Sequence, residues 1–292
     1  PSSKSNSHVL IWLAKSFLSS LLASFLIKKS NFGDSSSSFF FKIFNSLLLA
    51  RSFALETKSF DESLVQGVPL LLAGFTEVVK KYSIPSDYYE SFLDAMELDV
   101  SPKEFNDIED LIDNYVFGSA IVVGYFLAYV YGSSAKNNFA NTLKSSKELG
   151  IALQLTNFIR DINEDLKRER VYIPLTILKN NGIDLKNYSN NVKQNTNEIN
   201  LARKELASIA NYYYNESKKG IESFSPESRI AINACIELYG KLNDRIISRG
   251  NDIKYRESLS WSEKLGALPI SKYWKLPAAY LKSWKILVKM FA

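Results

Sequence analysis

The chain of 292 residues has 36 basic residues against 31 acidic residues, a formal net charge of +5. Its composition, 46% hydrophobic and 23% charged, is that of a globular protein and excludes wholesale disorder or a fibrous repeat. A single cysteine, Cys235, excludes a disulfide framework and a thiolate zinc cluster, and a single histidine, His8, excludes a histidine-rich metal site. Any metal would therefore have oxygen ligands, which points to a hard cation such as magnesium.

The positive charge is confined to the first 54 residues. They hold six basic residues and one acid, Asp34, whereas the rest of the chain holds 30 basic and 30 acidic residues. A neutral body offers no general attraction for a phosphate backbone, so we do not expect nucleic acid as a partner.

Residues 1–54 differ from the rest of the chain in being rich in serine and poor in acids, with apolar blocks at 9–27 and 39–50. This composition is typical of an organelle transit peptide. Residues 9–27 also have the length of a membrane span, although Lys15 and four serines weaken that interpretation. Two further interpretations are that the segment is not part of the working fold or that its sequence is incomplete or misassigned. We therefore divide the chain into an atypical N-terminal segment, 1–54, and a domain of residues 55–292.

Few turn-forming residues interrupt this domain, since the whole chain has 12 glycines and 8 prolines, and this predicts long helices. The spacing of apolar residues predicts one helix from Ser86 or Asp87 through Met96, and a second that Asp107 caps and Gly132 ends. Further helices are predicted at about 135–170, 193–220, 226–250 and 272–290, with boundaries at Pro174, Pro226 and Pro269. No alternating run of strand length occurs, so the predicted fold is a single all-α bundle.

The most informative stretch carries Asn157, Asp161 and Asp165 at four-residue intervals, which places them on one face of a helix. Two carboxylates at that spacing repel each other unless a cation lies between them. An amide oxygen and two carboxylates suit magnesium, and the guanidinium groups of Arg160 and Arg170 suit phosphate oxygens. The alternative is a solvated, charge-laced helix face.

The segment from Glu148 to Pro174, which contains this stripe, resembles the second aspartate-rich motif of the phytoene/squalene synthase family. The resemblance covers roughly residues 65–255 and is strongest to phytoene synthase. It includes Ile84-Pro85 through Met96 and Asp99, Tyr115 to Gly124 with Ile121 in place of a usual glycine, Tyr212 to Gly220, and Ser228 to Tyr239. The family's first aspartate-rich motif has no counterpart in residues 1–60, where Asp34 is the only acid before Glu56.

The resemblance implies an all-α bundle of the isoprenoid synthase type around a central apolar cavity. It implies head-to-head joining of two prenyl diphosphates through a cyclopropyl intermediate, with Mg²⁺, or Mn²⁺ in its place, helping the first diphosphate to leave. The implied metal ligands are Asn157, Asp161 and Asp165; the implied catalytic residues are Asp161, Asp165 and Tyr239; the implied substrate-binding residues are Arg160, Arg170, Tyr115, Tyr172, Gln154, Ala120 and Gly124. Ordinary core packing is the alternative for each tyrosine, and close helix contact is the alternative for the two small residues.

Three hypotheses for the function stay open. The first is formation of phytoene from two geranylgeranyl diphosphates, and the second is a squalene or dehydrosqualene synthase that uses farnesyl diphosphate. The third is a non-catalytic relative that acts as an assembly factor, which the missing first motif favours. Because the implied substrates are long hydrocarbons, we expect a cytoplasmic protein in peripheral contact with a membrane. Residues 273–292 fit an interfacial helix, with an ordinary terminal helix as the alternative.

Overall fold

A computed structural model describes residue 62 and residues 70–99, 102–135, 138–249, 253 and 256–267. The chain forms two compact units, one of residues 1–93 with 279–292 and one of residues 94–278, and each is described by itself. The expected N-terminal segment, its boundary at residues 54–55 and the helix predicted at 272–290 lie outside the described residues and stay predictions.

In the first unit, helix α4 (Leu70–Tyr82) is followed by α5 (Ser86–Leu98), whose last turn belongs to the second unit. The helix predicted to begin at Ser86 or Asp87 and to run through Met96 is therefore confirmed. Between the two helices, the backbone N–H of Ile84 donates to the carbonyl of Val79 (3.0 Å). The ring of Phe75 packs edge-on against that of Tyr89, with 6.3 Å between the ring centroids.

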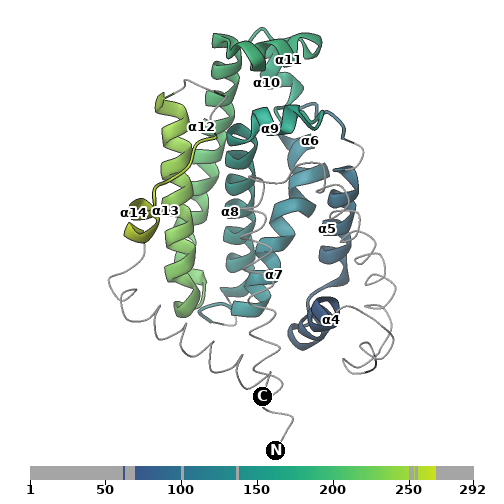
Figure 1. Ribbon diagram of the computed structural model, residues 1–292. Coiled ribbons are helices and arrows are strands. Elements are labelled where there is room, and N and C mark those ends of the chain that lie inside the picture. Colours follow the sequence, from purple (N-terminus) through teal and green to yellow (C-terminus); the bar gives the residue numbers. More distant parts are fainter. Residues whose placement is uncertain are drawn as a thin grey trace, which may run out of the picture. The chain divides into compact units, whose positions relative to one another are not determined.

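The second unit consists of helices and their connections. Among the described residues it contains no strand, and one isolated bridge joins Ser133 to Phe224. The helices, shown in Figure 1, are α6 (Ile108–Leu111), the π-helix η1 (Ile112–Ile121), α7 (Val122–Tyr131), α8 (Phe139–Arg160), α9 (Ile162–Leu166), α10 (Leu175–Asn180), α11 (Leu185–Gln194), α12 (Asn197–Lys219), the short 3₁₀ helix η3 (Ile221–Ser223), α13 (Pro226–Arg249) and α14 (Trp261–Gly266). The predicted all-α class is confirmed, as are the long helices predicted at 193–220 and 226–250.

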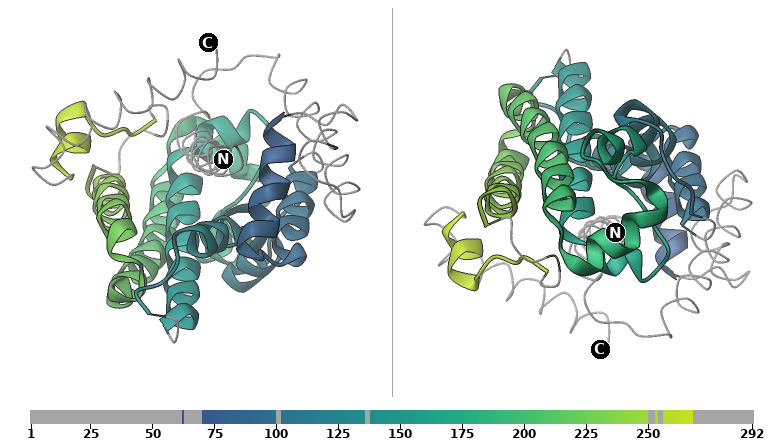
Figure 2. Two further views of the ribbon diagram at one scale, coloured as in Figure 1. Left: turned by 90° about the horizontal axis from the view of Figure 1, so that it is seen from below. Right: turned by 90° about the horizontal axis from the view of Figure 1, so that it is seen from above.

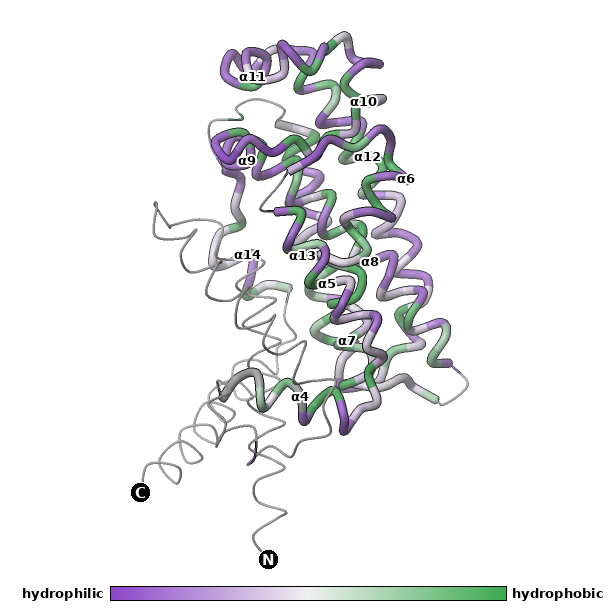
Figure 3. Tube along the Cα trace, turned by 90° about the vertical axis from the view of Figure 1, so that its right-hand side faces the viewer, coloured by the Kyte–Doolittle hydropathy of each residue, from purple (hydrophilic) through white to green (hydrophobic). Residues whose placement is uncertain are grey.

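Helix α8 is the central element of this unit. It packs against α12, η1, α7 and α13, and Figures 1 and 2 show it running between α7 and the α12–α13 pair. The core around it includes Val116, Leu155, Ile159 and Leu206, all fully buried. Figure 3 shows hydrophobic residues along α7 and hydrophilic residues over α9 and α11. Most side chains in the second half of α8 are therefore buried inside the bundle rather than exposed on its surface.

The helix from Ile108 to Tyr131 begins and ends where the sequence predicts. The Asp107 side chain accepts a hydrogen bond from the backbone N–H of Asp110 (2.8 Å), and Gly132 ends the helix with a φ of 74°. The π-helical stretch η1 in its middle was not predicted. This helix is long and apolar enough to cross a membrane, with a mean hydropathy of 1.5. However, 61% of its most apolar 18-residue stretch is buried within the protein. Packing against α8 accounts for its apolar character.

The predicted single helix over residues 135–170 is wrong in one respect, because the structure breaks it at Asp161. Helix α8 ends at Arg160, Asp161 takes φ −101° and ψ 13°, and α9 begins at Ile162. A turn at residues 167–169 follows, in which Glu169 adopts a positive φ of 57°. The chain therefore leaves its helical path at residues 167–169, before it reaches Tyr172.

Close contact between α8 and the preceding helix depends on Gly150. A Cβ atom there would lie 3.1 Å from both the carbonyl oxygen of Ala120 and the Cα of Ile121. We expect Gly150→Ala to lower the free energy of unfolding by about 1–3 kcal/mol, as overpacking against backbone does. Urea denaturation followed by circular dichroism measures this.

The matched control is Gly240→Ala on α13, where a Cβ meets no described atom within 4 Å. That change is expected to leave the protein equally stable or to stabilise it by about 0.5–1 kcal/mol, because alanine is the better helix former. If Gly150→Ala and Gly240→Ala have the same free energy of unfolding, the close contact at Gly150 is contradicted.

Candidate functional site

The three residues of the acidic stripe stay in register although the helix breaks between them. The backbone N–H of Asp161 donates to the carbonyl of Asn157 (2.9 Å), and that of Asp165 donates to the carbonyl of Asp161 (2.8 Å). All three side chains are buried, Asp161 completely. The alternative of a solvated helix face is therefore wrong for these residues, although residues 167–169 just beyond them are exposed.

The carboxylate of Asp161 is held between two guanidinium groups. Arg160 donates Nε to Oδ1 and an Nη to Oδ2, both at 2.8 Å. Arg256 donates Nε to Oδ1 at 2.7 Å. A buried carboxylate requires such partners, because an unpaired charge in the interior is strongly unfavourable. Arg256 was not predicted as a site residue, since it lies 95 residues further along the chain and outside the aspartate-rich motif.

A tyrosine of α13 completes this cluster, since Arg160 also interacts with the hydroxyl of Tyr239. Burial disfavours the charged form of Arg160, but the hydrogen bonds and charge of Asp161 outweigh burial and raise its pKa. Burial raises the pKa of Tyr239 to about 12, against the opposing charge of Arg160. Near neutral pH Arg160 is therefore charged and the phenol of Tyr239 is protonated.

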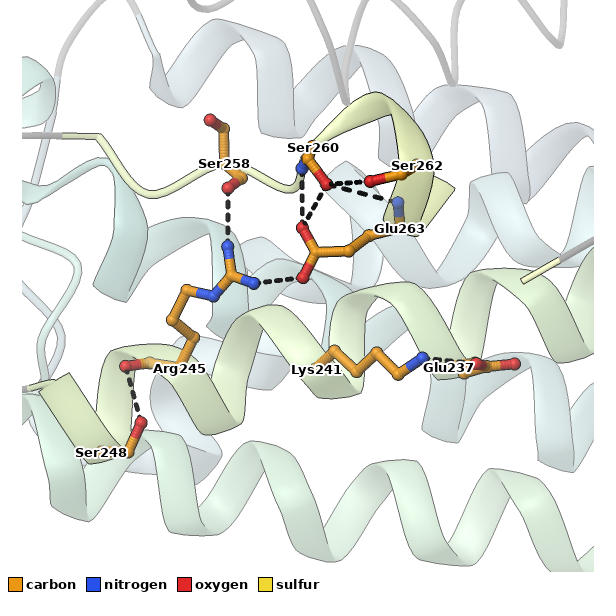
Figure 4. Close-up of polar contacts among 8 residues, drawn as sticks. All are labelled: Glu237, Lys241, Arg245, Ser248, Ser258, Ser260, Ser262 and Glu263. Carbon is orange, nitrogen blue, oxygen red and sulfur yellow. Dashed lines mark hydrogen bonds and ion pairs between the residues drawn. The ribbon is translucent and has the colours of Figure 1, made fainter. Parts of the chain in front are cut away.

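Hydrogen bonds and an ion pair hold the segment that carries Arg256 against α13, as Figure 4 shows. Arg245 donates an Nη to the carbonyl of Ser258 (2.9 Å) and pairs with Glu263. Ser260 caps α14 in a reciprocal capping box with Glu263. The hydrogen bonds from Ser260, with a smaller contribution from Arg245, lower the pKa of Glu263 to about 2. These contacts fix the chain close to the point where Arg256 reaches Asp161.

A second cluster brings Tyr115 of η1 together with Tyr172. Their hydroxyl oxygens are 3.1 Å apart, and both hydroxyls donate to Asp99. Burial raises the pKa of both tyrosines, and the charge of Asp99 adds to the effect. The ring of Phe158 stacks on that of Tyr172, with 4.3 Å between centroids and 16° between the planes. The rings of the two tyrosines therefore pack in the core, while their hydroxyls share the carboxylate of Asp99.

Arg170 joins this second cluster. Its Nη1 lies 3.3 Å from a carboxylate oxygen of Asp99, and its Nη2 donates to the backbone carbonyl of the same residue (2.6 Å). Burial disfavours the charged form of Arg170, but the nearby Asp99 more than compensates and raises its pKa. The backbone N–H of Arg170 donates to the carbonyl of Asp165 (3.0 Å), so the turn at residues 167–169 brings the second cluster next to the acidic stripe.

Gln154 links η1 to the stripe. Its Nε2 lies 3.4 Å from the hydroxyl of Ser119, and its Oε1 lies 3.4 Å from Nδ2 of Asn157. The Oδ1 atom of Asn157 is buried and receives no hydrogen bond from any described residue. A buried acceptor in that state is typical of a site that a ligand or water completes.

The small residues Ala120 and Gly124 lie at the contact with α8. A Cβ on Gly124 would come within 3.1 Å of the carbonyl oxygen of Ser146, and the carbonyl of Ala120 faces Gly150. Close helix contact, the alternative given for these residues, accounts for both of them. Their suggested part in making room for a prenyl tail stays a prediction, as does the central apolar cavity.

A polar cleft of about 410 Å³ lies beside the first half of α8. It contains none of the predicted site residues. The residues that line it are mostly charged or polar and come from α8, α12 and η3: Asn138, Asn141, Lys144, Ser145, Glu148, Glu216, Lys219, Gly220, Glu222 and Ser223.

The oxygen atoms of the stripe suit a hard cation. The buried Oδ1 of Asn157 and the carboxylates of Asp161 and Asp165 belong to the donor class that magnesium takes, and magnesium commonly completes its shell with water and substrate phosphates. Within the described part of the chain, no three histidine, cysteine, aspartate or glutamate residues lie close enough to hold a metal by themselves. The donor atoms are therefore of the type that magnesium takes, and both carboxylate oxygens of Asp161 already accept hydrogen bonds from arginines.

Comparison with known proteins matches most of the chain to the family that its sequence motifs resemble. The squalene/phytoene synthase family profile matches residues 49–264. The chain is 29% identical to a 15-cis-phytoene synthase of Enterobacter agglomerans over 73% of its own length and 70% of the relative's. It is 28% identical to phytoene synthase 1 of Solanum lycopersicum, a chloroplastic protein, of which it spans 52%. It spans 62% of a similar 15-cis-phytoene synthase from Pantoea ananas.

Solved structures show the same fold. A crystal structure of a dehydrosqualene synthase in complex with a ligand matches with a TM-score of 0.66 and 18% identity, over 94% of this chain and 87% of that one. A squalene synthase from Alicyclobacillus acidocaldarius matches with a TM-score of 0.55 and 17% identity, over 66% and 72% of the two chains. With an isoprenoid synthase-type fold and a profile match that spans the buried acidic stripe, the chain belongs to the squalene/phytoene synthase family.

Proposed function

We propose that this protein joins two prenyl diphosphates head to head, and that it makes phytoene from two molecules of geranylgeranyl diphosphate. The observation that carries the proposal is the buried stripe of Asn157, Asp161 and Asp165 beside Arg160. Oxygen donors and a guanidinium group at one point are what a leaving diphosphate and its counter-ion require. The relatives named phytoene synthase favour the longer substrate.

In this proposal Asn157, Asp161 and Asp165 hold Mg²⁺, and Mn²⁺ can take its place. The metal, when bound, withdraws charge from the departing diphosphate as a Lewis acid. Arg160 and Arg170 bind phosphate oxygens, for which a planar guanidinium is well suited. Gln154 orients Asn157 through its amide group.

The aromatic residues serve the hydrocarbon part of the reaction. Tyr115, Tyr172 and Tyr239 are protonated because burial raises their pKa values, so each offers an uncharged phenol ring with its π-face. A developing allylic cation is stabilised by such faces where water is excluded.

We also propose that the protein works in the cytoplasm in peripheral contact with a membrane, because its proposed substrates and product partition into lipid. An organelle address in residues 1–54 is the competing proposal for location. Extraction of membranes with carbonate tests the attachment. Release into the soluble fraction is expected, and retention until detergent is added would contradict peripheral contact.

The test of the reaction is incubation of the full chain with Mg²⁺ and radiolabelled geranylgeranyl or farnesyl diphosphate, with chromatographic identification of the products. We expect phytoene from the first substrate, loss of product when EDTA removes the metal, and recovery when Mg²⁺ is restored. A C30 product from farnesyl diphosphate alone would establish the second hypothesis instead. A folded protein that converts neither substrate would favour the third hypothesis, the non-catalytic assembly factor.

A further inference from the structure

One carboxylate, that of Asp99, connects three residues of the proposed substrate site. Its Oδ1 accepts hydrogen bonds from the hydroxyls of Tyr115 (2.6 Å) and Tyr172 (2.9 Å). Its Oδ2 lies 3.3 Å from Nη1 of Arg170, and its backbone carbonyl accepts from Nη2 of the same guanidinium (2.6 Å). Both terminal nitrogens of Arg170 are therefore held by a single residue.

The Nε donor of Arg170 indicates that the guanidinium has a further binding partner. Its Nε is buried and donates to no acceptor among the described residues. Since the guanidinium is planar and Asp99 holds its two terminal nitrogens, Asp99 also fixes the direction of the Nε–H. A buried donor in that state is usually completed by a ligand or by water. The guanidinium is thus held in place while its buried Nε donor stays available.

The position of Arg170 indicates what kind of ligand its Nε donor binds. Its backbone N–H donates to the carbonyl of Asp165, so Arg170 lies next to the end of the stripe that is proposed to hold the metal. The charges of Asp99 and Asp165 both act on its guanidinium. An arginine that binds phosphate beside a metal needs a fixed orientation, because its donors are planar and directional.

We propose that Asp99 is a positioning residue of the diphosphate site, which orients the guanidinium of Arg170 and the hydroxyl pair of Tyr115 and Tyr172 without touching the substrate itself. The proposal rests on the proposed function, in which Arg170 binds a phosphate oxygen. A purely structural role for Asp99 would support the fold but would leave diphosphate affinity unchanged in any variant that folds.

The test is Asp99→Asn in the full chain, which keeps the shape of the side chain and removes its charge. We expect the affinity for inorganic diphosphate, measured by calorimetry with Mg²⁺, to fall about ten- to a hundredfold, by analogy with the range typical of groups that orient the ligands of a metal. The KM for the prenyl diphosphate should rise by a similar factor, with a smaller change in kcat. Glu97→Gln, an exposed acid two residues away, is the matched control and should behave as wild type.

A double variant separates orientation from a general loss of charge. If Asp99 acts through Arg170, adding Asp99→Asn to Arg170→Lys should weaken diphosphate binding little beyond Arg170→Lys alone, because residues that act as one unit are not additive. Fully additive losses would overturn the proposal.

Asp99→Glu is the second variant, and it also serves if Asp99→Asn fails to fold. It keeps the charge but moves the carboxylate, so orientation by Asp99 predicts weakened diphosphate binding. Wild-type affinity in a folded variant at position 99, beside loss of affinity in Arg170→Lys, would overturn the proposal. Failure of the wild-type protein itself to bind diphosphate would instead count against the proposed function.

Discussion

Replacing Asp161 by asparagine is expected to lower the turnover of prenyl diphosphates about a hundredfold or more, as loss of an electrostatic contact in the transition state typically does. The carboxylate is fully buried and meets both Arg160 and Arg256. Its removal would take away a proposed metal ligand and release two guanidinium groups from their fixed positions. Asp165→Asn is expected to reduce turnover by a similar factor. Steady-state assays at saturating Mg²⁺ measure both effects.

Stability must be measured in parallel, because Asp161 also neutralises buried charge. Removing one partner of a buried ion pair commonly costs about 3–5 kcal/mol, so Asp161→Asn should also melt at a lower temperature than the wild-type protein. Glu164→Gln removes one charge from the same short helix at a partly exposed position and serves as the control. Near-normal turnover in both Asp161→Asn and Asp165→Asn would show that the stripe is not the metal site.

The long helices could be predicted because their signals are local. The cap at Asp107, the stop at Gly132 and the apolar periodicity of α12 and α13 all lie within the segments they define. The break of α8 at Asp161 has no such local signal. Its carboxylate is held partly by Arg256, a residue 95 positions away, and tertiary contacts of that kind do not appear in a helical pattern.

The same distinction applies to the candidate site. The four-residue spacing of Asn157, Asp161 and Asp165 survives the helix break, since the hydrogen bonds between their backbones continue through it. The sequence also contains Tyr115, Tyr172 and Arg170, but their common partner Asp99 precedes the nearest of them by 16 residues. Only the folded chain shows that one carboxylate serves all three. The π-helical form of η1, which carries Tyr115 and packs against α8, was likewise not predicted from the sequence.

Phe158→Ala is expected to lower the free energy of unfolding by about 3–5 kcal/mol, the usual cost of truncating a buried aromatic side chain. Phe158 is 1% exposed and packs against the rings of both Tyr172 and Tyr115, with its centroid 4.3 Å from the first and 6.0 Å from the second. Because small proteins are stable by only about 5–15 kcal/mol, this single change should shift the urea midpoint substantially. Urea titration followed by circular dichroism measures it.

Two further variants separate the loss of volume from the loss of the ring stack. Leu201→Ala, at a position 45% exposed on α12, should stay within about 0.5 kcal/mol of wild type, as surface substitutions do. Phe158→Leu keeps most of the apolar volume and loses the aromatic pair, which is worth about 0.5–1.5 kcal/mol beyond area burial, so it should be the milder of the two changes at this position. If the stack also holds Tyr172 against Asp99, Phe158→Leu should raise the KM for the prenyl diphosphate more than its small effect on stability would explain. A stable Phe158→Ala protein would mean that the ring is not a packed part of this core, and the Tyr115–Tyr172 pair would then owe its position to Asp99 alone.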